Sequence, residues 1–208
     1  MTNNFEFIKQ YMIELGIPML QKNVGDLFFQ VLLIRRGKDH PNLPSANYTF
    51  KSYYIDSIEK LNIVQDEIIK CCDIFKLRAY VSVAVKSKES YTKLCASNFS
   101  FNIYNNEFKK PWRIIDHVFG KLKSIDDRWI IDIDDNPSIE YFNEILRLIR
   151  ICDSKFKDPY ITHINTKSGI HVIAHPFNLK QFNDLCEYNQ IEKPDIKKDH
   201  ITLLYENL

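Results

Sequence analysis

The stretch at positions 128–135 reads Arg-Trp-Ile-Ile-Asp-Ile-Asp-Asp, an apolar run that ends in carboxylates. The apolar residues at 129, 130, 131 and 133 predict a buried strand. Because side chains alternate along a strand, Asp132 and Asp134 share one face, roughly 6.5 Å apart. The alternative is a strand that runs out into a polar turn capping the next helix. Asp135 fits that cap, but Asp132 lies between isoleucines, where an unpaired carboxylate is costly. Metal coordination would remove this cost.

Alternating patterns on both sides of this strand predict the fold class. After the strand at 128–134, the pattern predicts a helix at 138–151, strands at 160–165 and 170–174, a helix at 179–188 and a last strand at 201–205. This β-α-β-β-α-β order is typical of the ferredoxin-like, or RRM-like, arrangement. We therefore expect an α+β protein, in which an N-terminal mixed α/β unit (1–124) packs on a C-terminal RRM-like unit (125–208) as one compact domain.

The N-terminal part mixes both element types. Its patterns predict helices at 6–15, 57–75, 90–98 and 112–123, and strands at 27–34, 48–55 and 77–85. The chain has 208 residues, of which 45% are hydrophobic, enough for a sizeable core.

Charge and cysteine content narrow the setting. The formal net charge is +1, so any nucleic-acid contact must come from local patches. The five cysteines form no Cys-x-x-Cys pair, so we expect no structural zinc and a reducing compartment. The longest apolar run is too short to span a bilayer, and the N-terminus does not resemble a signal peptide. We expect a cytoplasmic protein without membrane contact.

A second motif lies at the predicted turn between the two middle strands of the C-terminal unit. There the chain reads Ser168-Gly169-Ile170-His171, and Gly169 permits a tight turn. A strand histidine alone is more often structural. Beside an Asp-x-Asp strand, however, a hydroxyl and an imidazole at a turn can bind the phosphates of a metal-bound nucleotide.

A site with two metal ions needs a third carboxylate. Asp199 precedes the last predicted strand and is the first candidate, with Asp195 as the substitute. In a ferredoxin-like sheet the first and third strands are central and the fourth is an edge beside the first, which leaves the distance of Asp199 open.

Together these motifs resemble the archaeo-eukaryotic primase superfamily, the primase-polymerases. That family combines hydrophobic-Asp-x-Asp/Glu, Ser-x-His and a later hydrophobic-Asp on an RRM-like subdomain. The resemblance covers residues 128–208, and Ser-Gly-Ile-His here is one residue longer than Ser-x-His. It implies that Asp132, Asp134 and Asp199 hold Mg²⁺ or Mn²⁺, and that Ser168 and His171, with Lys167, bind the triphosphate.

Three functions remain open. The first is a nucleotidyltransferase that joins nucleoside triphosphates on a nucleic-acid template, DNA in the first instance, as a host, phage or plasmid gene. The second is a catalytically silent primase-like module that binds nucleic acid or a replication partner such as a helicase. The third, a metal-dependent phosphohydrolase, fits less well, because Asn136 replaces the Thr of the haloacid dehalogenase pattern Asp-x-Asp-x-Thr.

Overall fold

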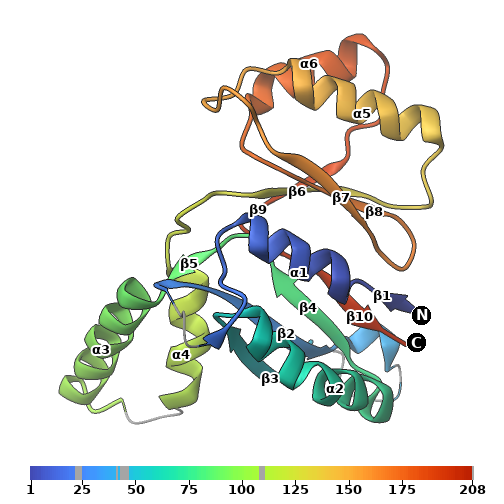
Figure 1. Cartoon of the computed structure of the whole chain (residues 1–208). Coiled ribbons are helices and arrows are strands. Elements are labelled where there is room, and N and C mark those ends of the chain that lie inside the picture. The colour runs from blue at the N-terminus through green and yellow to red at the C-terminus, as the bar shows by residue number, and fades with distance from the viewer. Residues whose placement is uncertain (22–24, 41, 43–46, 108–110, 208) are drawn as a thin grey trace.

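The protein has a mixed α+β fold with two antiparallel sheets (Figure 1). The computed structural model describes residues 1–21, 25–40, 42, 47–107 and 111–207. Six α-helices lie in these ranges. None of the helices in the described ranges is both long and apolar enough to cross a bilayer. The predicted α+β class is confirmed.

The first sheet has six strands in the order β1-β10-β4-β2-β3, with β5 paired to β2. These strands are β1 (Thr2–Asn3), β2 (Leu27–Arg35), β3 (Tyr48–Ile55), β4 (Arg78–Ser82), β5 (Lys86–Ser87) and β10 (Ile201–Glu206). The helices of this part are α1 (Phe5–Glu14), α2 (Ile58–Phe75), α3 (Lys88–Tyr104) and α4 (Pro111–Lys121), with a short 3₁₀ helix, η2 (Gly37–Asp39). Helices α3 and α4 pack against each other at one end of the sheet (Figure 1).

The second sheet has four strands in the order β7-β8-β6-β9, and every neighbouring pair is antiparallel. Its elements follow one another as β6 (Trp129–Ile133), α5 (Ile139–Ile151), β7 (Ile161–Asn165), β8 (Ile170–Ala174), α6 (Leu179–Tyr188) and β9 (Asp195–Lys198). Its first and third strands, β6 and β8, are central. The fourth, β9, is an edge strand beside the first.

Local sequence explains the two helices of this sheet. Ser138 caps α5, since its side chain accepts a hydrogen bond from the Tyr141 amide, and Asn178 caps α6 in the same way. The sequence suggested that Asp135 caps the following helix, but Asp135 does not cap α5. Together with Asn136 it adopts positive φ in the turn before the cap. Short polar side chains tolerate this conformation better than most.

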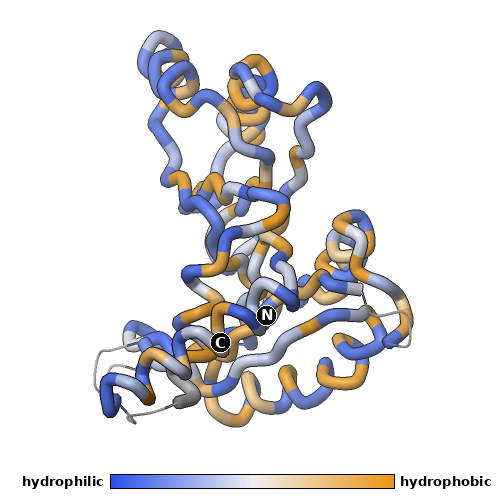
Figure 2. Tube along the Cα trace, turned by 90° about the vertical axis from the view of Figure 1, so that its left-hand side faces the viewer, coloured by the Kyte–Doolittle hydropathy of each residue, from blue (hydrophilic) through white to orange (hydrophobic). Residues whose placement is uncertain are grey.

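Each face of the second sheet belongs to a different hydrophobic core. Ile131 and Ile133 of β6 point toward α5 and α6, and pack there with Val172 of β8. The opposite face contributes Ile130, Ile164 and Ile173 to the core of the first sheet, α1 and α2. Figure 2 shows the second sheet and its helices above the first sheet, with both chain ends in the lower part. The two sheets therefore share buried apolar contacts.

The last predicted strand lies in a different sheet from the one expected. Residues 201–206 form β10, which pairs with β1 and β4 in the first sheet. The short strand β9, which the sequence analysis did not predict, takes the edge beside β6. The physical reason is burial: residues 202–206 of β10 are all buried, so both faces of the strand are covered, which suits a position inside a sheet rather than at an exposed edge.

The shared core predicts that the two sheets unfold together. Ile173 is fully buried in the core of the first sheet although it belongs to β8. We expect Ile173→Ala to lower the free energy of unfolding by about 2–5 kcal/mol, with a single transition in urea followed by circular dichroism and by tryptophan fluorescence. Ile63→Ala, at a side chain that is 66% exposed, is the matched control and should change stability little. Two separate transitions in the Ile173 variant would contradict a shared core.

Candidate functional site

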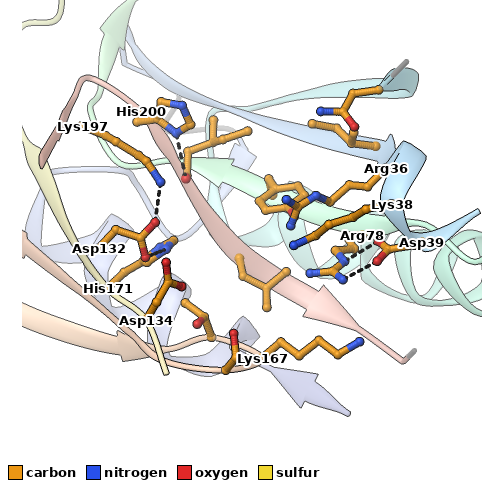
Figure 3. Close-up of a pocket in the computed structure, with 17 residues that line it drawn as sticks. Arg36, Lys38, Asp39, Arg78, Asp132, Asp134, Lys167, His171, Lys197 and His200 are labelled. Carbon is orange, nitrogen blue, oxygen red and sulfur yellow. Dashed lines mark hydrogen bonds and ion pairs between the residues drawn. The ribbon is translucent and has the colours of Figure 1, made fainter. Parts of the chain in front are cut away.

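A cavity of about 750 Å³ lies between the two sheets. Figure 3 shows it with Asp132 of β6 and Asp134, which follows β6, on one side, and with Arg36, Lys38 and Arg78 on the other. Both sheets contribute side chains to its walls. The first sheet and η2, with the residue between β2 and η2, contribute Ile34, Arg36, Lys38, Asp39, Arg78, Tyr80, Ile201 and Leu203. Strands of the second sheet contribute Asp132, His171 and Lys197, and connecting segments contribute Asn47, Asp134, Thr166, Lys167, Ser168 and His200.

Asp132 has a close partner at each of its two carboxylate oxygens. Strand pairing sets it opposite His171 of β8 on one side and Asp195 of β9 on the other. Its Oδ1 lies 3.0 Å from His171 Nε2, and its Oδ2 accepts a hydrogen bond from Lys197 Nζ. The side chain is only 12% exposed. Asp132 therefore has the partners that a carboxylate inside a strand requires.

These contacts keep Asp132 ionised. The hydrogen bond from His171 lowers the pKa of Asp132 well below its usual 3.8, burial opposes this shift, and the hydrogen bond from Lys197 adds to it. Burial alone would lower the pKa of Lys197, but the carboxylates of Asp132 and Asp195 together outweigh burial and raise that pKa above its usual value. The result is a charged pair at neutral pH.

His171 links Asp132 to the first sheet. Its Nδ1 lies 2.8 Å from Oγ1 of Thr202, a fully buried residue of β10. Because an ionised carboxylate only accepts hydrogen bonds, Nε2 donates to Asp132, and a neutral imidazole then accepts the Thr202 hydroxyl proton at Nδ1. The ring orientation of His171 is thus set from both sheets.

Asp134 and the loop between β7 and β8 complete the acidic side. Asp134 is exposed, and its carboxyl group points to the same side of β6 as that of Asp132 (Figure 3). Ser168 also lines the cavity, and its carbonyl accepts a hydrogen bond of 2.8 Å from the Asn136 amide. Lys167 lines the cavity too, but its side chain runs away from the aspartates (Figure 3).

Gly169 brings the loop close to the end of β6. A Cβ at this position would lie 2.0 Å from the carbonyl oxygen of Ile133 and 3.0 Å from Cα of Asp134. The φ angle of Gly169 is not positive, so the glycine is needed for close approach rather than for a left-handed turn. The sequence predicts a tight turn here. The structure supplies a different reason for the same residue.

The opposite wall is basic. Arg78 donates two hydrogen bonds to Asp39, Nε to Oδ2 at 2.8 Å and Nη2 to Oδ1 at 2.7 Å. This bidentate pair holds η2 against the sheet. Arg36 and Lys38 reach from this wall toward the aspartates (Figure 3). The wall opposite Asp132 and Asp134 therefore carries three cations, Arg36, Lys38 and Arg78, and one carboxylate, Asp39.

Asp199 does not join Asp132 and Asp134. It has positive φ, its amide donates to the Arg128 carbonyl, and its carboxylate lies 3.0 Å from Nζ of the buried Lys86. It lines a separate cavity of about 310 Å³. Asp195, the substitute candidate, is the cross-strand neighbour of Asp132, and its side chain is 69% exposed.

Several residues in and next to the cavity were not predicted from the sequence. Lys197 and Thr202, the partners of Asp132 and His171, were missed because β9 was not recognised and β10 was assigned to the other sheet. The spacing of two between Asp195 and Lys197 was the available signal. Arg36 and Lys38, which are close together in the chain, were missed too, because only the packing of the two sheets brings them opposite the aspartates.

The donor set at Asp132 and Asp134 suits a hard divalent cation. Two carboxylates on one face, with oxygens turned to a polar cavity, are the ligands that Mg²⁺ and Mn²⁺ prefer. Within the described ranges, no three His, Cys, Asp or Glu side chains gather closely enough to enclose a metal ion. The two aspartates thus fit an open site with further ligands from water or a bound phosphate.

Gly169 offers a test of how the site is positioned. Gly169→Ala should push the β7–β8 loop away from β6, because a methyl group has no room beside the Ile133 carbonyl. We expect a loss of about 1–3 kcal/mol in unfolding free energy, together with changed backbone amide shifts at Asp134 and Ser168. Gly120→Ala, in α4 with nothing within 4 Å of the new Cβ, is the control and should not destabilise the fold. Unchanged stability and shifts in the Gly169 variant would contradict this packing.

Comparisons with known proteins do not place the chain in a family. No protein-family model, no curated protein and no solved structure matches it. The geometry of the cavity is therefore the basis for any statement about function.

Proposed function

We propose that the chain is a metal-dependent nucleotidyltransferase of the primase-polymerase type, which joins nucleoside triphosphates on a nucleic-acid template, with DNA as the first template to test. One observation carries the proposal: Asp132, Asp134, Ser168 and His171 meet in a single cavity that has a basic wall opposite. A metal-bound triphosphate needs both charges, carboxylates for the metal and cations for the phosphates.

The topology of the second sheet supports the RRM-like assignment. Its element order is β-α-β-β-α-β, its first and third strands are central and its fourth strand is an edge beside the first. These are the relations expected for an RRM-like unit. The first sheet and its helices then correspond to the N-terminal mixed α/β unit, to which β10 is added.

On the acidic side, Asp132 and Asp134 would hold Mg²⁺ or Mn²⁺, with the remaining ligands from water or the triphosphate. When bound, such ions activate a 3′-hydroxyl group and neutralise charge on the triphosphate. Of the two further acids predicted from the sequence, Asp199 is paired with Lys86 in another cavity, and Asp195 is the cross-strand neighbour of Asp132 but does not line the cavity wall.

On the phosphate side, Ser168 lines the same cavity as the aspartates and would bind the phosphates nearest the metal. His171, whose Nε2 donates to Asp132 and whose Nδ1 lies against Thr202, would join it once Asp132 turns from the imidazole to the metal ion. Arg36 and Lys38 face them across the cavity and would compensate the remaining charge (Figure 3). Lys167 points away from the aspartates, so it would serve the outer end of the triphosphate or a strand of nucleic acid. A cytoplasmic replication system of a host, phage or plasmid, with a helicase among its partners, is the setting we propose.

The alternative is a catalytically silent primase-like module that binds nucleic acid or a replication partner. Two observations favour it: Lys197 and His171 occupy both oxygens of Asp132, and Asp199 lies outside the cavity. The two functions differ in one binding measurement. A silent module should show no Mn²⁺-dependent binding of a nucleoside triphosphate by calorimetry.

Isosteric substitution of the aspartates tests the activity. Asp132→Asn combined with Asp134→Asn removes both carboxylates but keeps the side-chain shape. We expect Mn²⁺-dependent nucleotide incorporation on a primed or unprimed template to fall more than about a hundredfold, since even outer-shell partners of metal ligands cost ten- to a hundredfold. Circular dichroism should show an unchanged fold.

Asp135→Asn is the matched control. Asp135 is exposed, is absent from the cavity wall and has a positive φ that Asn tolerates. Incorporation should stay at the wild-type rate in this variant. If the double variant retains full incorporation, the assignment to a nucleotidyltransferase with these ligands is wrong.

A further inference from the structure

We propose that Lys197 is a built-in counter-ion of Asp132, which neutralises this carboxylate in the metal-free protein and leaves it for the triphosphate when a divalent cation binds. The inference rests on the proposed function, which it deepens by naming how the site is held between substrates. Its first basis is geometry. Lys197 Nζ donates to Asp132 Oδ2 and lies 3.5 Å from Asp195 Oδ2.

The register of β6 with β9 accounts for the contact between Lys197 and Asp132. Asp132 is opposite Asp195, and Ile130 is opposite Lys197, so all four side chains share one face of the sheet. The next residue, Lys198, lies on the other face, where its ammonium group stands 4.8 Å from the centre of the Trp129 ring. Lys197 is therefore directed at Asp132 by the alternation of β9.

Burial explains why Asp132 needs a cation at all times. Its side chain is 12% exposed, and an ionised carboxylate at that depth is costly without a partner. An ammonium group and a divalent metal ion both satisfy this need, but they repel each other on the same oxygen. Lys197 and a metal ion should consequently exclude one another at Oδ2.

The surroundings of Lys197 leave room for its ammonium group to move away from Asp132. Its side chain is 33% exposed and lines the cavity, and Asp195 already shares its ammonium group. Lysine carries its charge on a flexible four-carbon stem, so it can move several ångströms without backbone change. Within the cavity, triphosphate oxygens would be the strongest available acceptors for the released ammonium group.

The test measures metal binding without nucleotide. Free Mn²⁺ is followed by electron paramagnetic resonance in titrations of the full chain, its Lys197→Met variant and a second neutral variant, Lys197→Gln. We expect both neutral variants to bind Mn²⁺ at least about tenfold more tightly than the wild type, because one competing positive charge is removed. Lys198→Met, on the opposite face, should bind Mn²⁺ as the wild type does, and Lys197→Arg, which keeps the charge, should bind Mn²⁺ less tightly than the two neutral variants.

A second readout separates this role from a structural one. With Mn²⁺ saturating, we expect Lys197→Met to bind a non-hydrolysable deoxynucleoside triphosphate analogue about tenfold more weakly, since a phosphate contact is lost. A lysine that only supports the fold would weaken both metal and nucleotide binding when replaced. Effects of opposite sign support the exchange of Lys197 between Asp132 and phosphate.

The outcomes distinguish this inference from the proposed function. If Mn²⁺ binds, binding is lost in Asp132→Asn, and the neutral Lys197 variants bind no more tightly than the wild type, the counter-ion role is overturned and the metal site stands. If neither the wild type nor the neutral variants bind Mn²⁺ through Asp132, both proposals are overturned. Tighter Mn²⁺ binding in the neutral variants that is lost again on adding Asp132→Asn supports both.

Discussion

The carboxylate of Asp132 is largely buried and therefore needs hydrogen-bonding partners, and these partners connect the two sheets. Asp132 lies in a central strand, and its two oxygens are held by His171 from β8 and Lys197 from β9. His171 is in turn bonded to Thr202 in β10, a strand of the other sheet. A polar network thus runs from one sheet to the other beside the apolar contacts of Ile130, Ile164 and Ile173. Removing one member of such a network leaves the others unsatisfied. The register of β6 with β8 and β9 and the docking of the second sheet on β10 therefore depend on each other.

The sequence predicted several elements with their bounds. The bounds predicted for β3, β8 and α6 agree with those observed, and the alternation around Asp132 placed its side chain on the correct face. The pairing of the last strands was not predictable in the same way. The strand β9 reads Asp-Ile-Lys-Lys and has no apolar run, so it gives no strand pattern of its own. The apolar β10 was assigned to the nearest sheet, although its burial on both faces suits the larger one.

Part of the site could also be predicted from the sequence. Asp132, Asp134, Ser168 and His171 come from neighbouring strands of one unit, and the structure places them around one cavity. Asp199 was chosen because it precedes an apolar run, but a left-handed turn at this residue redirects the chain and leaves it beside Lys86. The basic wall depends on how two sheets meet and on the Arg78–Asp39 pair that holds η2. Such long-range proximity follows from the fold and leaves no mark in local sequence.

The central claim is that Asp132 and Asp134 form a cation site facing a triphosphate-binding wall. Anomalous diffraction from crystals soaked with Mn²⁺ and a non-hydrolysable nucleoside triphosphate tests it most directly. The account predicts a manganese peak within coordination distance of both carboxylates, with the phosphates between it and the wall formed by Arg36 and Lys38. Nucleotide bound elsewhere, or a cavity in which Lys197 still holds Asp132 and no manganese peak lies nearby, would contradict it.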